Sequence, residues 1–141
     1  MPAFDICIRG SGAVGLATAL ALSRQGLSIA MTAGPAPASS ARLDVLEPDF
    51  SVQRAYALNA VSVRLLTELK VWEALPTDAR TPVHDMRIEG DASGSALDFS
   101  AWTQGVEQLA WIVDAAELEG SLAAAVRFAP HVTRLAQDDV D

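Results

Sequence analysis

Three glycines near the start of the chain have the spacing of a phosphate-binding turn. Gly10, Gly12 and Gly15 form the pattern G-x-G-x-x-G. The first allows a sharp turn, the second lets the backbone approach a pyrophosphate, and the third lets a helix pack closely on a strand. Ala13 and Val14 then begin that helix, whose free N–H groups and positive dipole end attract phosphates. The pattern predicts a dinucleotide site at these five residues.

The residues around the glycines predict a βαβ unit. Residues 4–8 are a short apolar run, 13–25 are rich in Ala and Leu, and 27–32 are a second apolar run of strand length. Gly26 is placed to end the helix. Two strands that flank one helix imply parallel pairing with a right-handed crossover. Because the glycines lie between strand and helix, a purely structural glycine turn is the weaker interpretation.

The end of the second strand departs from the usual dinucleotide site. A carboxylate commonly lies there and binds the ribose hydroxyls, but this position falls near Thr32 or Ala33. The next acids along the chain are Asp44, Glu47 and Asp49, and none of them is favoured as a substitute. No basic residue replaces the carboxylate, so the sequence gives no support to NADP recognition through a 2′-phosphate.

Two side chains of the first strand allow more than one interpretation. Arg9 ends an otherwise apolar run. It either faces the phosphates or pairs with a carboxylate at the edge of the sheet. Cys7 is the only cysteine, so it has no internal disulfide partner. We expect it to be a small buried hydrophobe rather than a reactive thiol.

The rest of the chain predicts further helices and strands. Leucines at three- and four-residue spacing indicate a helix over 55–75, divided in two if it breaks near Lys70. Trp102 and Trp111 are expected to pack in the core of a sheet, the weaker alternative being that they line an aromatic pocket. Later patterns predict a hairpin of strands 83–89 and 96–100, a strand 109–113, a helix 115–128 and a strand 132–136. Together these elements predict an α/β fold that consists of a Rossmann-like βαβ unit with a parallel sheet and a β-hairpin. We expect this fold to be incomplete.

The overall composition excludes several classes of function. The chain has 18 acidic and 10 basic residues, whereas a nucleic-acid binder needs a basic surface. The apolar stretch 16–22 is too short to cross a membrane, and no signal peptide is visible, so we expect a cytoplasmic protein without an integral membrane segment. His84 and His131 lack metal-ligand spacing, so no metal site is expected.

Four stretches of the sequence resemble one family of flavoproteins. They are 5–15 with the glycine turn, Arg54-Ala55-Tyr56-Ala57-Leu58-Asn59, Leu69-Lys70-Val71-Trp72-Glu73-Ala74-Leu75, and Leu109-Ala110-Trp111-Ile112-Val113-Asp114. In this order they resemble FAD-dependent aromatic-ring monooxygenases, most closely the ubiquinone-biosynthesis hydroxylases. The glycine motif is common to many flavoproteins, and its combination with Arg54 and Trp72 is much more specific.

The resemblance implies an FAD cofactor, with NAD(P)H as co-substrate, O2, and a small aromatic substrate. It implies that Arg54 contacts the flavin cofactor, the alternative being a solvated arginine at the start of a helix. Residues 1–141 then correspond to the N-terminal part of an FAD-binding domain, with 83–111 as a substrate-side β insertion. The family's Asp-Gly motif is missing, as is its Gly-Asp motif in the family's context. We therefore expect a truncated chain with little or no turnover, and no catalytic residue can be named.

Two other functions are compatible with the same residues. An NAD-binding oxidoreductase domain shares the glycine turn but does not explain residues 54–75. A non-catalytic fragment that acts by association agrees with the missing carboxylate after the second strand. An open sheet edge would also allow a homo-oligomer to form.

Overall fold

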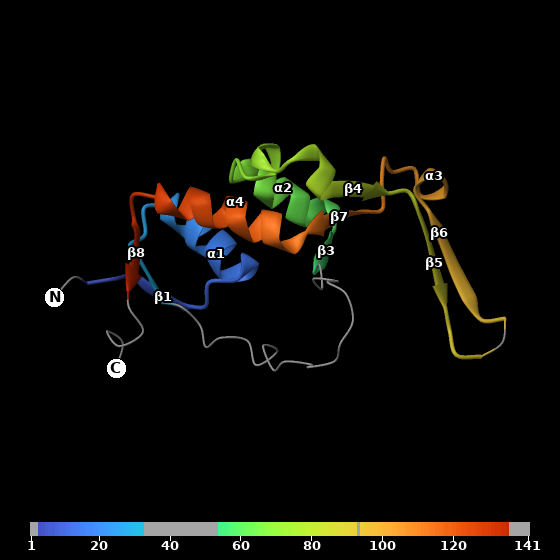
Figure 1. Ribbon diagram of the computed structural model, residues 1–141, viewed down its shortest axis with the longest axis horizontal. Coiled ribbons are helices and arrows are strands. Elements are labelled where there is room, and N and C mark those ends of the chain that lie inside the picture. The colour runs from blue at the N-terminus through green and yellow to red at the C-terminus, as the bar shows by residue number, and fades with distance from the viewer. Residues whose placement is uncertain (1–2, 33–53, 93, 136–141) are drawn as a thin grey trace, which may run out of the picture. The chain divides into compact units, whose positions relative to one another are not determined.

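The computed structural model describes residues 3–32, 54–92 and 94–135. The chain forms two compact units, one from Met1–Gln53 with Glu119–Asp141 and the other from Arg54–Leu118. Helix α4 (Ala115–Arg127) begins in the second unit and continues into the first (Figure 1). Within the described residues, no helix is long and apolar enough to cross a membrane.

The first unit contains a three-stranded parallel sheet. Its strands are β1 (Ile6–Arg9), β2 (Ile29–Thr32) and β8 (Val132–Leu135), in the order β1-β2-β8. All four residues of the central strand β2 are buried, as expected for a parallel strand with neighbours on both sides. Helix α1 (Ala13–Ser23) connects β1 to β2. This arrangement confirms the predicted Rossmann-like βαβ unit.

Helix α1 packs very closely on the turn that precedes it. A Cβ atom built on Gly15 would collide with the carbonyl oxygen of Gly10 and lie 3.6 Å from Cγ2 of Ile8. Leu16, with 2% of its surface exposed, is buried next to this contact point. The helix ends at Ser23, and the turn after it closes at Gly26, whose φ of 83° suits a residue without a side chain. The third glycine of the motif is therefore required by packing.

The second unit contains an antiparallel sheet that the sequence only partly predicted. Its strands are β3 (Ala55–Leu58), β7 (Ala110–Asp114) and β4 (Arg80–Val83), in the order β3-β7-β4. The predicted helix over 55–75 is thus wrong at its start. Residues 55–58 pair with β7 in full register, from Ala55 opposite Asp114 onward, and this long-range pairing overrides the local helical spacing.

The helical part of this segment begins only after Asn59. The side chain of Asn59 accepts a hydrogen bond from the amide of Ser62 at 2.9 Å and so caps α2 (Ala60–Glu68). The predicted break near Lys70 is confirmed, because Lys70 has a φ of 61°. Two short 3₁₀ turns follow, η2 (Trp72–Ala74) and η3 (Thr77–Ala79).

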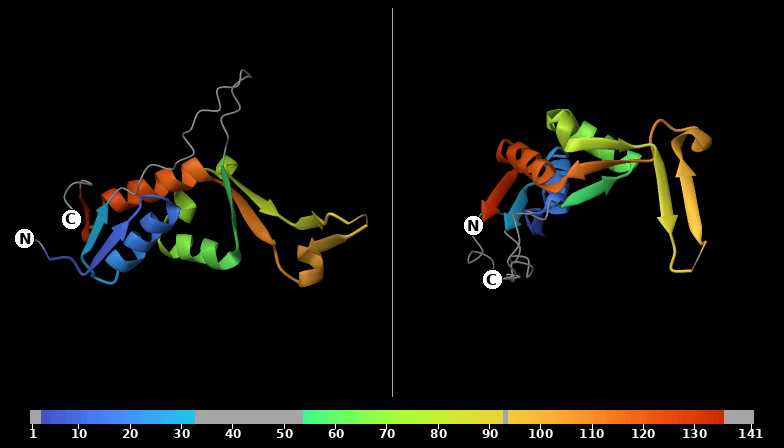
Figure 2. Two further views of the ribbon diagram at one scale, coloured as in Figure 1. Left: turned by 90° about the horizontal axis from the view of Figure 1, so that it is seen from below. Right: turned by 45° about the vertical axis from the view of Figure 1, so that its right-hand side comes forward.

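A hairpin of β5 (Asp85–Glu89) and β6 (Ala96–Ser100) forms its own two-stranded sheet, as predicted (Figure 2). The short helix α3 (Ala101–Gln104) follows it. Trp102 on this helix is 91% exposed, so the expectation of core packing was wrong for that residue. Trp111 instead lies edge-to-face with Trp72, with ring centroids 5.3 Å apart.

The buried apolar side chains fall into a set for each unit. Those of the first unit come from α1, β2 and the C-terminal half of α4. Those of the second come from α2, the turn after it, the start of α3, β7 and the start of α4. They are Leu16, Ala19, Leu20, Ile29, Ala30, Met31, Leu122 and Val126 in the first unit, and Leu66, Leu69, Val71, Leu75, Ala101, Val113, Ala115 and Leu118 in the second.

The carboxylate of Asp5 stabilises the start of the parallel sheet through hydrogen bonds, so the stability of the protein should depend on pH. Asp5 accepts hydrogen bonds from the amide of Ser28 at 2.8 Å and from its hydroxyl at 2.9 Å. These bonds, led by the backbone one, lower the pKa of Asp5 below 3.8. The stabilisation is therefore present above pH 3.8 and is lost as the pH falls through the lowered folded-state pKa.

Asp5→Asn should lower the melting temperature at pH 7, because an amide accepts weaker hydrogen bonds than a carboxylate. The difference in melting temperature between Asp5→Asn and the wild type should become smaller as the pH is lowered below 3.8. Asp91→Asn, in the exposed hairpin turn, is the control for loss of one charge. Thermal unfolding followed by circular dichroism measures both. If the difference in melting temperature between Asp5→Asn and the wild type stays constant at all pH values, the Asp5 carboxylate does not stabilise the sheet in this way.

The tight packing of Gly15 predicts opposite effects for two glycine substitutions in helices. Gly15→Ala should destabilise the protein by about 1–3 kcal/mol, because the new methyl group meets the backbone of Gly10. Gly120→Ala, in α4, should stabilise it by about 0.5–1 kcal/mol, because a Cβ there has no neighbour within 4 Å. Urea unfolding gives both values. A Gly15→Ala protein as stable as Gly120→Ala would show that α1 does not lie this close to the turn.

Candidate dinucleotide-binding site

The turn between β1 and α1 begins at a glycine that few other residues could replace. Gly10 has a φ of 134°, a region that residues with a side chain rarely adopt. Its amide donates a hydrogen bond to the carbonyl oxygen of Thr32 at 3.0 Å. This bond joins the turn to the end of β2, so the turn lies at the carboxyl edge of the sheet. Ligands of open α/β sheets bind at this edge.

Gly12 is different, because nothing in the fold requires it to be a glycine. Its φ of −79° and ψ of 179° are accessible to any residue, and a Cβ atom there would have no neighbour within 4 Å. Gly12 precedes the first residue of α1 and accepts a hydrogen bond from the amide of Leu16 at 3.0 Å. The absence of a side chain therefore leaves an open space directly in front of the helix.

The N-terminus of α1 lacks the side-chain cap that the other long helices have. Asn59 caps α2, and Asp114 accepts hydrogen bonds from the amides of Ala116 at 2.8 Å and Glu117 at 3.0 Å at the start of α4. At α1, Gly12 offers no cap and the first turn contains no acid. The first amides of a helix have no partner within it. They and the positive dipole end are thus available to an anion at this helix.

These features fit a pyrophosphate. Gly10 turns the chain, Gly12 leaves the space, Gly15 brings the helix close, and the amides of Ala13 and Val14 begin the helix at that space. Val14 is 81% exposed, so the first turn is open to solvent. The structure brings together all five residues that the motif predicted, and their contact with a cofactor stays a prediction.

Arg54 belongs to the second unit, whereas the glycine turn belongs to the first. Its side chain is exposed, and its carbonyl oxygen accepts a hydrogen bond from the amide of Ala115 at 2.9 Å. It precedes strand β3, so the alternative of a solvated arginine is wrong only in placing the residue at the start of a helix. Its contact with a flavin remains a prediction.

The structure also locates the residues that made the sequence unusual. Thr32 ends β2 and is 4% exposed, while Asp44, Glu47 and Asp49 lie outside the described residues. Cys7 is exposed, so the expectation of a buried thiol was wrong. The sequence showed an apolar run but not that β1 is an edge strand, where alternate side chains stay accessible.

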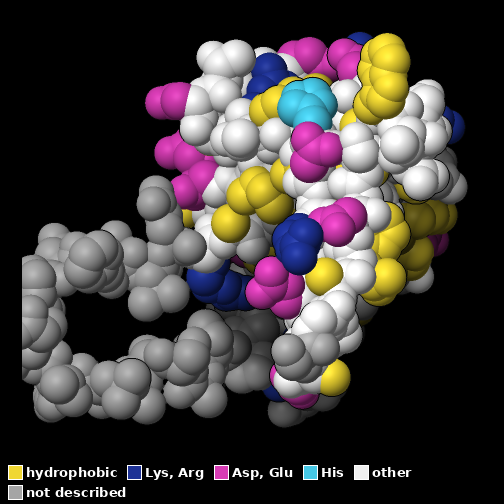
Figure 3. All heavy atoms as spheres, turned by 90° about the vertical axis from the view of Figure 1, so that its right-hand side faces the viewer, with side chains coloured by type: hydrophobic (Ala, Val, Ile, Leu, Met, Phe, Trp, Pro, Cys, Tyr) yellow, Lys and Arg dark blue, Asp and Glu magenta, His cyan; other side chains and the backbone are white. Residues whose placement is uncertain are grey.

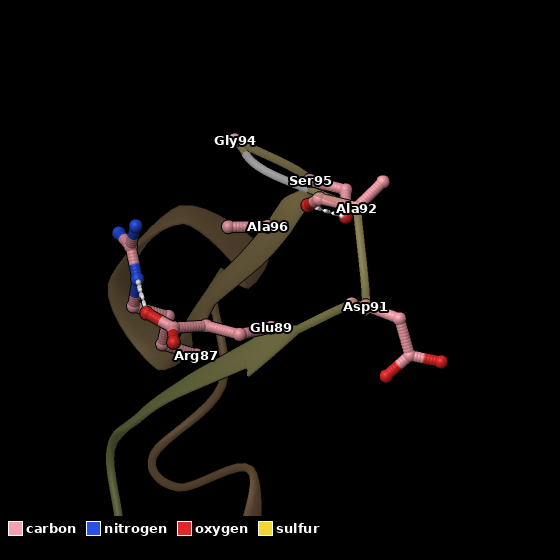
Figure 4. Close-up of a pocket in the computed structure, with 8 residues that line it drawn as sticks. Arg87, Glu89, Asp91, Ala92, Gly94, Ser95 and Ala96 are labelled. Carbon is pink, nitrogen blue, oxygen red and sulfur yellow. Dashed lines mark hydrogen bonds and ion pairs between the residues drawn. The ribbon is translucent and has the colours of Figure 1, made fainter.

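A pocket lies at the tip of the β5–β6 hairpin and has no chemistry that suggests a site. It has a volume of about 260 Å³, and turn residues line it together with Arg87 and Glu89 (Figure 4). Arg87 is already engaged there, at 3.1 Å from Glu89 and 3.3 Å from Asp98. Among the residues that the structure describes, no group of His, Cys, Asp and Glu could hold a metal ion.

Comparison with solved structures relates the whole chain to flavoenzymes. PqsL of Pseudomonas aeruginosa, a probable FAD-dependent monooxygenase, matches with a TM-score of 0.65 and 16% identity over 94% of this chain and 32% of its own. p-Nitrophenol 4-monooxygenase PnpA of Pseudomonas putida DLL-E4 matches with a TM-score of 0.61 and 13% identity over 93% of this chain and 30% of its own.

The flavin-dependent monooxygenase PieE, solved in complex with FAD and substrate, matches with a TM-score of 0.57 and 19% identity over 94% of this chain and 23% of its own. No protein-family model matches the chain. The chain thus spans a third or less of the length of these structures. At these identities the likeness establishes the fold alone, which is the fold of the matched part of these structures.

Proposed function

We propose that this chain binds FAD through its glycine turn, as the N-terminal part of a monooxygenase that hydroxylates an aromatic ring. The observation that carries the proposal is the turn itself, where Gly12 leaves open space before an uncapped helix. The likeness to FAD-dependent monooxygenases over more than nine-tenths of the chain supports the choice of FAD over NAD. The resemblance of the sequence motifs to ubiquinone-biosynthesis hydroxylases supports a substrate similar to a ubiquinone precursor, with NAD(P)H and O2 as co-substrates.

Each residue of the proposed site has a defined role. The amides at Ala13 and Val14 hold the pyrophosphate of FAD, and Gly10 and Gly15 position them. For Arg54 the proposal rests on the family resemblance alone, which implies contact with the flavin cofactor through a guanidinium that can fork onto phosphate. When bound, FAD supplies the electron transfer and the oxygen chemistry. The protein side of the reaction is therefore binding and orientation, which agrees with the lack of a recognisable acid–base group.

We assign residues 83–111 to the substrate side of the enzyme. In the β5–β6 hairpin, Met86 pairs with Phe99 and Ile88 with Leu97, so one face is apolar. These four side chains are 37–62% exposed. The other face carries Arg87 with its acidic partners, and Figure 3 shows hydrophobic and charged side chains close together at this surface. A two-stranded hairpin of this kind is marginally stable until its apolar face is covered.

The same apolar face favours a second candidate function, association without turnover. Uncovered apolar surface of this kind commonly marks an interaction site. The two candidates differ in whether the chain binds FAD. Retention of FAD by the purified chain supports the proposal that it is part of a monooxygenase. A stable oligomer that binds no FAD supports association alone.

Filling the space at Gly12 should separate cofactor binding from folding. Gly12→Asp places a carboxylate at the N-cap of α1, where it accepts amide hydrogen bonds and faces the positive dipole end. Its melting temperature should equal or exceed that of the wild type. FAD affinity should fall by about tenfold or more, because the carboxylate occupies the amides and repels phosphate. Quenching of flavin fluorescence measures the affinity.

Gly12→Ser is the matched control, because it fills the same space and caps the helix without adding a charge. It should weaken FAD binding less than Gly12→Asp and leave the melting temperature unchanged. A titration with NAD under the same conditions tests the NAD-binding alternative. Unaltered FAD affinity in Gly12→Asp would show that the cofactor binds elsewhere, and preferential binding of NAD would favour the other class of oxidoreductase.

A further inference from the structure

Arg9 is a charged residue beside the glycine turn that the proposed function leaves unused. It is the last residue of β1, immediately before Gly10, and its side chain is exposed. Within residues 3–32, 54–92 and 94–135, no carboxylate forms an ion pair with it. The interpretation that Arg9 pairs with an acid at the sheet edge therefore finds no support there.

The register of the sheet places Arg9 next to the end of β2. Arg9 is the direct partner of Thr32, and adjacent strands lie about 4.8 Å apart. Paired residues point to the same face of a sheet, while Ile8 and its partner Met31 point to the other face. Ile8 is the residue that approaches Gly15, so this other face carries α1. Arg9 and Thr32 therefore share the face turned away from α1.

The position of Thr32 is where a dinucleotide site usually has its ribose-binding carboxylate. Such a carboxylate accepts the ribose hydroxyls and repels a 2′-phosphate by its charge. Here the strand ends in a buried, uncharged Thr32, and its direct partner on β1 is the cation of Arg9. Among the described residues, this end of the sheet therefore carries a positive charge where the usual site carries a negative one.

We propose that Arg9 gives this dinucleotide site the ability to accept a phosphate on the 2′-hydroxyl of the adenosine ribose. Its ligands are then adenine dinucleotides with or without the 2′-phosphate, because a guanidinium binds phosphate in a forked geometry. The sequence offered Arg9 as a residue that faces the phosphates, but it did not place this cation beside the end of β2, because the pairing of Arg9 with Thr32 is a matter of register. The inference rests on the proposed binding of a pyrophosphate at the glycine turn.

The experiment compares the affinities of ADP-ribose and 2′-phospho-ADP-ribose for the whole chain by calorimetry at fixed salt. We expect the phosphorylated ligand to bind at least as tightly as ADP-ribose. Arg9→Gln should lower the affinity for 2′-phospho-ADP-ribose by about tenfold, the size of one charge-assisted contact. It should change the affinity for ADP-ribose far less. Arg9→Lys should restore part of the loss, because it keeps the charge without the fork.

Arg134→Gln is the matched control. It removes the same charge from the same sheet, but Arg134 pairs with Met31 and lies on the opposite face. It should leave the ratio of the two affinities unchanged. Tenfold discrimination against the 2′-phosphate by the wild type, or an unchanged ratio in Arg9→Gln, overturns the role of Arg9 while the glycine site stands. Failure of both ligands to bind overturns the glycine site and this inference with it.

Discussion

Helix α1 approaches the turn at Gly10 so closely that residue 15 has no room for a side chain. This contact sets where the helix starts and so where its first amides lie. Gly10 supplies the turn with its positive φ, and its bond to Thr32 joins the turn to β2. The open space at Gly12 and the uncapped amides follow from this arrangement. The proposed site is thus made from backbone, which needs no particular side-chain chemistry to hold a pyrophosphate.

The elements nearest the glycine turn could be predicted because their signals are local. A glycine pattern between two apolar runs specifies strand, turn and helix within about thirty residues, the size of a βαβ unit. The hairpin and α4 were predictable for the same reason, since alternation and helical spacing each lie within one segment. The likeness of the chain to flavin-dependent monooxygenases agrees with the family that the motifs suggested, although it does not distinguish ubiquinone-biosynthesis hydroxylases among them.

The features that the sequence missed depend on partners far along the chain. Residues 55–58 have helical spacing but become β3 because β7, more than fifty residues later, pairs with them. Cys7 was expected to be buried, and its exposure depends on β1 lying at the edge of the sheet. The pairing of Arg9 with Thr32 is likewise a matter of register, which alternation of residue types leaves undefined. Local pattern thus identified the glycine turn and its position between strand and helix, whereas the charged side chain beside the turn could be placed only from the pairing of the sheet.

Amide NMR shifts of the isotopically labelled chain during titration with FAD test most directly whether main-chain groups hold the cofactor. If the amides before and within the first turn of α1 grip the pyrophosphate, the signals of Gly12, Ala13, Val14 and Gly15 will shift most. They will saturate together with the quenching of flavin fluorescence. FAD that binds while these four signals stay in place, with the largest shifts elsewhere, would contradict the proposed site.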